Sequence, residues 1–134
     1  MSTHLVETSV LTRHLLPEIE RALRPFQGNL ARCTLTDLEL GFSPANARQW
    51  DDRQQVLTAF EPVDVTPEVI TRAKTVQRLL ADRGLKGRKV PDLIIAAAAE
   101  LAGLTLLHYD QDFEIIASVT GQPHTWIVPR GTVN

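Results

Sequence analysis

The chain has 134 residues, of which 43% are hydrophobic and 22% charged, which is the balance of a folded globular protein and excludes a disordered chain. The formal net charge of −2 argues against binding nucleic acid through overall positive charge, although clustered basic residues can still bind RNA. No run of about 20 apolar residues and no signal peptide occurs, and Cys33 is alone, so we expect a single domain spanning residues 1–134, with no membrane association, in the reducing cytoplasm.

A short first strand is predicted at residues 3–6, directly before Glu7. Thr8 and Ser9 are residue types that cap helices, so we expect them to precede the first helix. Pro17 restarts this helix, because proline is favoured at a first helical position. The restarted helix has an apolar stripe with a 3.6-residue period, formed by Leu16, Ile19, Leu23 and Phe26.

A second strand is predicted at residues 30–34. Thr36 and Glu39 then match a capping box, in which the threonine caps a helix and the glutamate three residues later reaches back to it. The polar region 45–60 is predicted to be helical, and its charges are typical of a solvated face. A third strand is predicted at residues 62–65.

The second half of the chain begins with a clear helix start, where Thr66 is the cap and Pro67 the first residue. After a short basic loop, Asp92 lies in the first turn of an alanine-rich helix. An apolar strand follows that helix, and Asp110 and Asp112 come directly after the strand.

A last strand is predicted at residues 125–128, which completes the order β-α-β-α-β-α-α-β-α-β. This alternation predicts an α/β protein with a mainly parallel sheet covered by helices on both faces. Ligands bind such sheets beyond the carboxyl ends of the strands, where Glu7, Glu39 and Asp110 are expected. Asp92 joins them if its helix starts at the same edge.

Acids that meet at one edge predict a metal site. Neighbouring carboxylates repel, which raises their pKa values unless a cation is present. Mg²⁺ or Mn²⁺ takes oxygen ligands and can activate water against a phosphodiester. Zinc is not indicated, because the chain has no histidine cluster and no second cysteine. Each acid also has a simpler interpretation, namely a capping box for Glu39, a helix-dipole acid for Asp92, and an ordinary turn for Asp110 and Asp112.

Four segments resemble the motifs of PIN-domain ribonucleases, and more closely those of VapC toxins from bacterial toxin–antitoxin pairs. They are LVETSVL (residues 5–11), TDLE (36–39), PDLIIAA (91–97) and YDQDF (109–113). The resemblance implies a three-layer α/β/α PIN-like fold with a central, mainly parallel sheet of four to five strands. It also implies an endoribonuclease that depends on Mg²⁺ or Mn²⁺, forms a homodimer and is neutralised by a VapB-type antitoxin.

By this resemblance, four acids would be both catalytic and metal-binding: Glu7, Glu39, Asp92 and Asp110. Asp112 would be an additional metal ligand. Thr8 and Ser9 would support the site, because a hydroxyl there can steady a carboxylate or a bound water.

The first of these acids departs from the family pattern, which has aspartate where this chain has Glu7. A misplacement of roughly 1 Å in a catalytic group can reduce the rate about a hundredfold. Three interpretations are open: a natural variant whose metal has moved, a weakened relative, or an engineered substitution. The alternative function is therefore a weakened PIN module that binds RNA or antitoxin without efficient cleavage.

The RNA-binding candidates near this edge are basic residues, Arg13, Arg88 and Lys89, which contact phosphates or simply form a solvated surface. If RNA is the substrate, loops or single strands, as in tRNA or rRNA, are better targets than a uniform duplex. A phospho-accepting receiver domain is disfavoured, because such a domain has a lysine before the proline after its last strand, where this chain has Val128.

Overall fold

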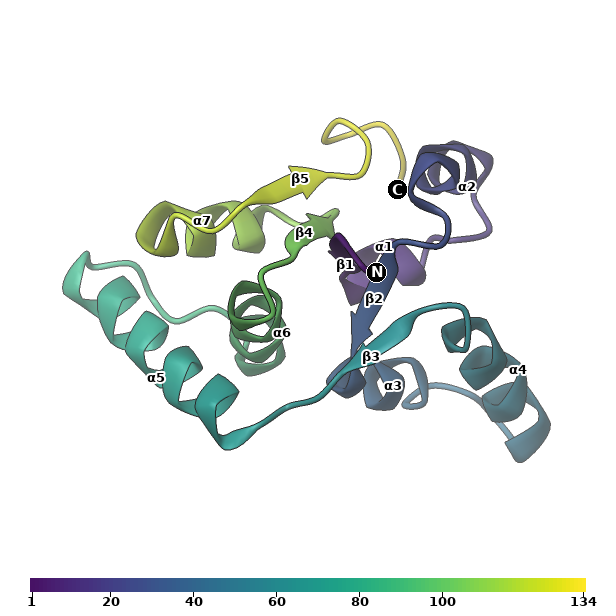
Figure 1. The fold of residues 1–134 in the computed structure, drawn as a ribbon, viewed down its shortest axis with the longest axis horizontal. Coiled ribbons are helices and arrows are strands. Elements are labelled where there is room, and N and C mark those ends of the chain that lie inside the picture. The colour runs from purple at the N-terminus through teal and green to yellow at the C-terminus, as the bar shows by residue number, and fades with distance from the viewer.

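A computed structural model describes all 134 residues. Five strands form one sheet in the order β3-β2-β1-β4-β5, and every neighbouring pair is parallel (Figure 1). The strands are β1 (His4–Val6), β2 (Leu30–Cys33), β3 (Glu61–Val63), β4 (Thr105–His108) and β5 (His124–Trp126). At the centre, Leu5 of β1 is aligned with Ala31 of β2 and Leu106 of β4. The predicted α/β class with a parallel sheet is confirmed.

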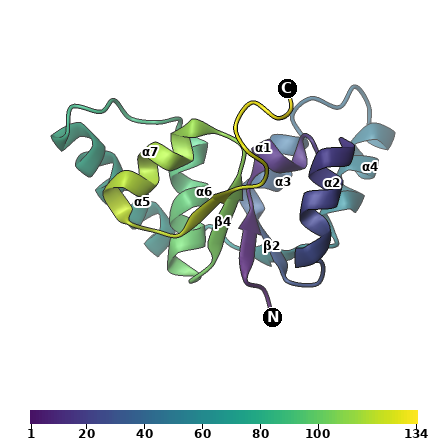
Figure 2. The same ribbon diagram turned by 90° about the horizontal axis from the view of Figure 1, so that it is seen from above.

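The helices are α1 (Thr8–Leu11), α2 (Pro17–Leu23), α3 (Thr34–Leu40), α4 (Ala47–Leu57), α5 (Pro67–Asp82), α6 (Val90–Leu101) and α7 (Gln111–Thr120), with a short 3₁₀ helix η1 (Arg24–Phe26). Figure 2 shows α5, α6 and α7 on one side of the strands and α1, α2 and α4 on the other. None of these helices has both the length and the hydrophobicity needed to cross a membrane.

Each face of the sheet has its own hydrophobic core, because successive side chains of a strand point to opposite faces. Leu5 and Leu106 pack on the α5–α7 side, whereas Val6 and Leu107 pack on the side of α1 and α2. The central strands are therefore buried on both faces, as expected for parallel strands between two helical layers. The predicted three-layer α/β/α arrangement is confirmed.

The alanine-rich helix α6 lies between the sheet and α5 (Figure 1). Its four consecutive alanines, 96–99, are all buried, and such small side chains allow close packing against neighbouring elements. Gly103 follows the helix with a φ of 70°, a left-handed conformation that glycine adopts without strain. This turn reverses the chain into β4, so the N-terminus of α6 lies at the edge of the sheet where β4 ends.

Two predicted helix starts are wrong. Thr36 does not cap a helix, because α3 already begins at Thr34 with Cys33 as its N-cap; Glu39 lies near the end of α3 and is not a capping-box partner. Thr8 and Ser9 lie inside α1, whose N-cap is Glu7. In both cases the helix begins earlier than predicted: α3 follows β2 with no residue between them, and only Glu7 separates β1 from α1.

The remaining boundaries differ by one to three residues, and the largest difference is at the end of α4, which is Leu57 where residue 60 was predicted. The second strand ends at Cys33, the third is Glu61–Val63 where residues 62–65 were predicted, and the last is His124–Trp126 where residues 125–128 were predicted. The start of α5 is confirmed, since Thr66 Oγ1 accepts a hydrogen bond from the Val69 N–H at 3.3 Å.

Candidate metal centre

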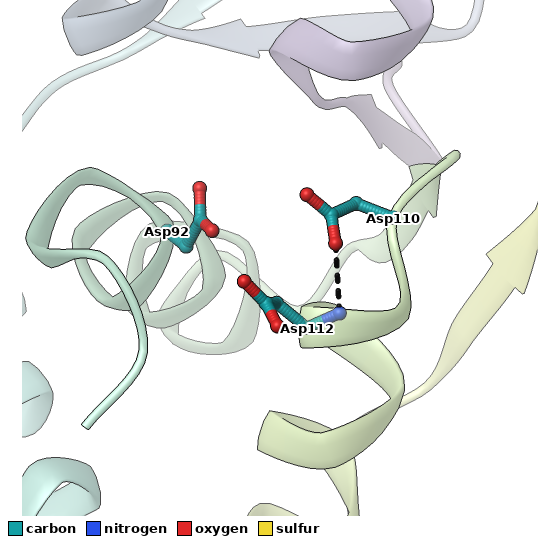
Figure 3. A group of neighbouring side chains, drawn as sticks. All are labelled: Asp92, Asp110 and Asp112. Carbon is teal, nitrogen blue, oxygen red and sulfur yellow. Dashed lines mark hydrogen bonds between the residues drawn. The ribbon is translucent and has the colours of Figure 1, made fainter. Parts of the chain in front are cut away.

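Three aspartates meet at the carboxyl edge of the sheet. One carboxylate oxygen from each of Asp92, Asp110 and Asp112 lies within 4.8 Å of the others. Figure 3 shows that Asp92 comes from the start of α6, whereas Asp110 and Asp112 come from the start of α7. The helix that carries Asp92 therefore starts at the edge where β4 delivers Asp110, which is the topology that the sequence argument required.

Asp92 is the most deeply placed of the three. Asp92 is only 7% exposed, and its Oδ2 atom is buried without any hydrogen-bond partner. Burial, followed by the charges of Asp110 and Asp112, raises the pKa of Asp92 to about 7. A buried carboxylate oxygen without a partner is unfavourable unless a cation or donor fills the site. A hard divalent ion bound at this oxygen would supply the partner that it lacks.

Asp110 and Asp112 are held by local hydrogen bonds. The Asp112 N–H donates to Asp110 Oδ1 at 2.9 Å, which makes Asp110 the N-cap of α7. The Asp110 N–H in turn donates to His108 Nδ1 at 3.3 Å. Arg88 contacts Asp112, with 3.1 Å between Nη1 and Oδ1. Both carboxylates are thus oriented by the chain itself.

Glu7 lies at the end of β1 and is only 3% exposed. Its Oε1 atom accepts hydrogen bonds from both the N–H and the hydroxyl of Ser9. The same hydroxyl accepts the Tyr109 N–H at 2.9 Å, so Ser9 joins the ends of β1 and β4. Burial raises the pKa of Glu7 to about 8, the charges of Asp92 and Glu39 add to this effect, and the bonds from Ser9 oppose it.

Glu39 is held by two threonine hydroxyls that are hydrogen-bonded in series. Thr8 Oγ1 donates to Glu39 Oε1 at 2.7 Å, and Thr8 Oγ1 and Thr36 Oγ1 lie 2.9 Å apart. Because the Thr8 proton is committed to Glu39, Thr36 is the donor of the second bond. Thr36 is fully buried, so its hydroxyl positions Thr8 instead of capping a helix.

The five acids expected to bind metal thus form two sets. The three aspartates form one compact group, whereas Glu7 and Glu39 lie outside it and are each held by their own hydroxyl. They remain close enough for their charges to interact, because Glu39 raises the pKa values of both Asp92 and Glu7.

The three basic candidates are placed differently. Arg88 contacts Asp112, and the charge of Lys89 lowers the pKa of Asp92 against the larger effect of burial. Arg13 donates to the carbonyls of Ser9 and Asn134 at 2.6 and 2.8 Å. Its binding to RNA remains a prediction.

His108 is a site residue that the sequence argument missed. It is fully buried at the end of β4, and its Nε2 atom lies 2.9 Å from Nδ1 of His124. Because its Nδ1 accepts the Asp110 N–H, its Nε2 carries the proton and donates to His124. Burial is the largest cause that lowers the pKa of His108, to about 4. A histidine at the end of an apolar strand gives no sequence signal of such a role.

Comparison with known proteins places this geometry in a family. Residues 4–119 match the PIN domain model. The chain is 48% identical to Ribonuclease VapC51 of Mycobacterium tuberculosis, over 98% of this chain and 97% of that protein. It is 43% identical to Ribonuclease VapC21 of the same species, over 96% of each. Among solved structures, a DNA-bound VapBC from Salmonella typhimurium shares the fold with a TM-score of 0.79 and 17% identity, over 96% of this chain and 100% of that one. The chain therefore belongs to the PIN-domain family and, within it, to the VapC ribonucleases.

Proposed function

We propose that this chain is a Mg²⁺- or Mn²⁺-dependent endoribonuclease toxin. The observation that carries the metal dependence is the buried Oδ2 of Asp92, which has no partner and belongs to a group of three carboxylates within 4.8 Å. Three carboxylate oxygens suit a small hard cation, which usually keeps several waters as its other ligands. Asp92, Asp110 and Asp112 would hold it. When bound, it would supply water activation and neutralise phosphodiester charge.

The two glutamates lie outside the group of three aspartates and, in the proposed site, act beside it. Ser9 occupies Oε1 of Glu7, which leaves Oε2 without a hydrogen bond and free to face water or substrate. In the metal-free protein burial raises the pKa of Glu7 to about 8, and a cation bound nearby would favour its charged form. Thr8 fixes Glu39 in its orientation.

The distribution of basic residues supports RNA as the substrate. Half of the 14 lysines and arginines lie between residues 72 and 89, a segment whose only acid is Asp82. This segment runs from α5 into the loop before Asp92, so a phosphate backbone bound along it would be led to the three aspartates. We propose exposed loops of tRNA or rRNA as the target class, because unpaired nucleotides can enter such a site.

The test is cleavage of total RNA by the purified chain with Mn²⁺ or with EDTA, followed by mapping of the new ends. We expect defined cuts that need Mn²⁺ and that Asp92→Asn reduces at least a hundredfold. Asp51→Asn is the matched control, since Asp51 is exposed in α4 and lies outside the basic segment, and it should cleave like the parent. Cleavage in EDTA, or full activity of Asp92→Asn, would contradict the proposed metal site.

A weakened PIN module is the second candidate, and the position of Glu7 favours it. Its Oε1 is bonded to Ser9, and the carboxylate lies outside the group of three aspartates. RNA binding that persists while Mn²⁺ produces no cleavage would support this candidate over the toxin.

We also propose that a VapB-type antitoxin neutralises the chain, which itself forms a homodimer in the cytoplasm. A groove of about 390 Å³ between α1 and α4 supports the antitoxin, because its apolar lining includes Leu11, Leu40, Val56 and the 84% exposed Leu15. Leu15→Glu should weaken antitoxin binding about tenfold, whereas Leu101→Glu, an exposed leucine outside the groove, should not. Equal binding by both variants would rule out this groove.

A further inference from the structure

One basic side chain of this protein already contacts the group of three aspartates. Arg88 Nη1 lies 3.1 Å from Asp112 Oδ1, and the two side chains are only 21% and 24% exposed. The other ion pairs join residues outside this group, such as Arg72 with Glu100. Asp112 therefore differs from Asp92, whose Oδ2 has no partner at all.

The guanidinium of Arg88 is also held by hydrogen bonds to the main chain. Its Nε and Nη2 atoms donate to the Lys86 carbonyl at 3.2 and 2.9 Å. This fork closes a short turn of the loop between α5 and α6 and directs Nη1 at Asp112. An arginine fixed in this way loses little conformational freedom when it pairs, so the contact is stronger than that of two mobile surface side chains.

We propose that Arg88 is a positioning residue that competes with the divalent ion for Asp112. The inference rests on the proposed function, in which the three aspartates bind that ion. Asp112 offers Oδ1 to the guanidinium, so this oxygen must leave Arg88 before it can bind a cation among the three carboxylates. Arg88 thus keeps metal affinity low until it releases Asp112, and an RNA phosphate is the kind of anion that could draw it away.

The competition predicts that removal of the guanidinium strengthens metal binding. Arg88→Gln should bind Mn²⁺ about tenfold more tightly than the parent, measured by calorimetry or by the loss of the free Mn²⁺ signal. Arg83→Gln is the matched control: Arg83 carries the same charge nearby but donates to the Ser118 carbonyl and contacts no acid. It should change the affinity less than twofold.

A double-mutant cycle tests the route through Asp112. In an Asp112→Asn background, the additional Arg88→Gln change should give less than a twofold gain, because the carboxylate for which the cations compete is gone. A tenfold gain that persists there, or an affinity of Arg88→Gln equal to or below the parent's, overturns the inference. Thermal unfolding in EDTA confirms that each variant is folded.

Asp92→Asn separates this inference from the proposed function in the same assay. If Asp92→Asn loses Mn²⁺ binding while Arg88→Gln binds like the parent, the metal site stands and the role of Arg88 is wrong. If Asp92→Asn binds Mn²⁺ like the parent, the metal site itself is wrong, and the inference about Arg88 falls with it.

Discussion

The buried Glu7 carboxyl should make the stability of the metal-free protein depend on pH, and Glu7→Gln should remove this dependence. Burial is the largest cause that raises the Glu7 pKa from 4.5 to about 8, with Asp92 and Glu39 contributing in the same direction. Glutamine has the same shape and can accept both hydrogen bonds from Ser9, but it carries no charge.

The sign follows from proton binding. Between pH 4.5 and about 8, the native protein keeps the Glu7 proton, whereas the unfolded chain releases it. The free energy of unfolding therefore falls as the pH rises through this window, by up to about 1.4 kcal/mol per pH unit. Over the whole window the free energy of unfolding falls by at most about 5 kcal/mol. This is a large part of the ~5–15 kcal/mol that stabilises a typical domain.

The assay is urea unfolding in EDTA at several pH values from 5 to 8.5, about one unit apart, for the parent and Glu7→Gln. The difference between the two proteins isolates Glu7, because Asp92 and His108 are present in both. Glu7→Gln should gain stability relative to the parent as the pH rises. Glu18→Gln is the matched control, since Glu18 is exposed in the first turn of α2. A stability difference that stays constant with pH would refute the reasoning.

Two further variants test the site and its support. Glu7→Asp, which restores the family's residue, should raise Mn²⁺-dependent RNA cleavage about tenfold or more, and unchanged or lower activity in a side-by-side assay would contradict this. Arg32→Ala should lower the free energy of unfolding by about 2–4 kcal/mol in urea, because Arg32 binds both carboxylate oxygens of Asp37 and the carbonyls of Leu57 and Phe60. Arg24→Ala, which breaks only an exposed ion pair, should have little effect, and an equal loss in both would disprove the role of Arg32.

Local patterns predicted the architecture because they report local physics. A short apolar run marks the buried strand β4, and a threonine followed by proline marks the start of a helix at Pro67. The alternation of these elements is enough to predict a parallel sheet with Asp110 at its carboxyl edge, whereas the place of Asp92 depended on where its helix starts. Element boundaries were predicted less accurately. Thr36 was predicted as a helix cap, but α3 begins two residues earlier, at Thr34, directly after β2.

The sequence by itself thus determined the α/β fold, the position of Asp110 after a strand and the position of Asp92 at a helix start. Only the tertiary structure decided how the acids are held: Ser9 joins Glu7 to Tyr109, Thr8 reaches Glu39, and Arg88 pairs with Asp112. The first two contacts depend on the neighbouring positions of β1, β2 and β4, and the third on the packing of a loop against α7. Hydrophobic periodicity records which face of an element is buried, but it does not record which distant side chain will lie opposite, and the chemistry of the acidic site depends on those partners.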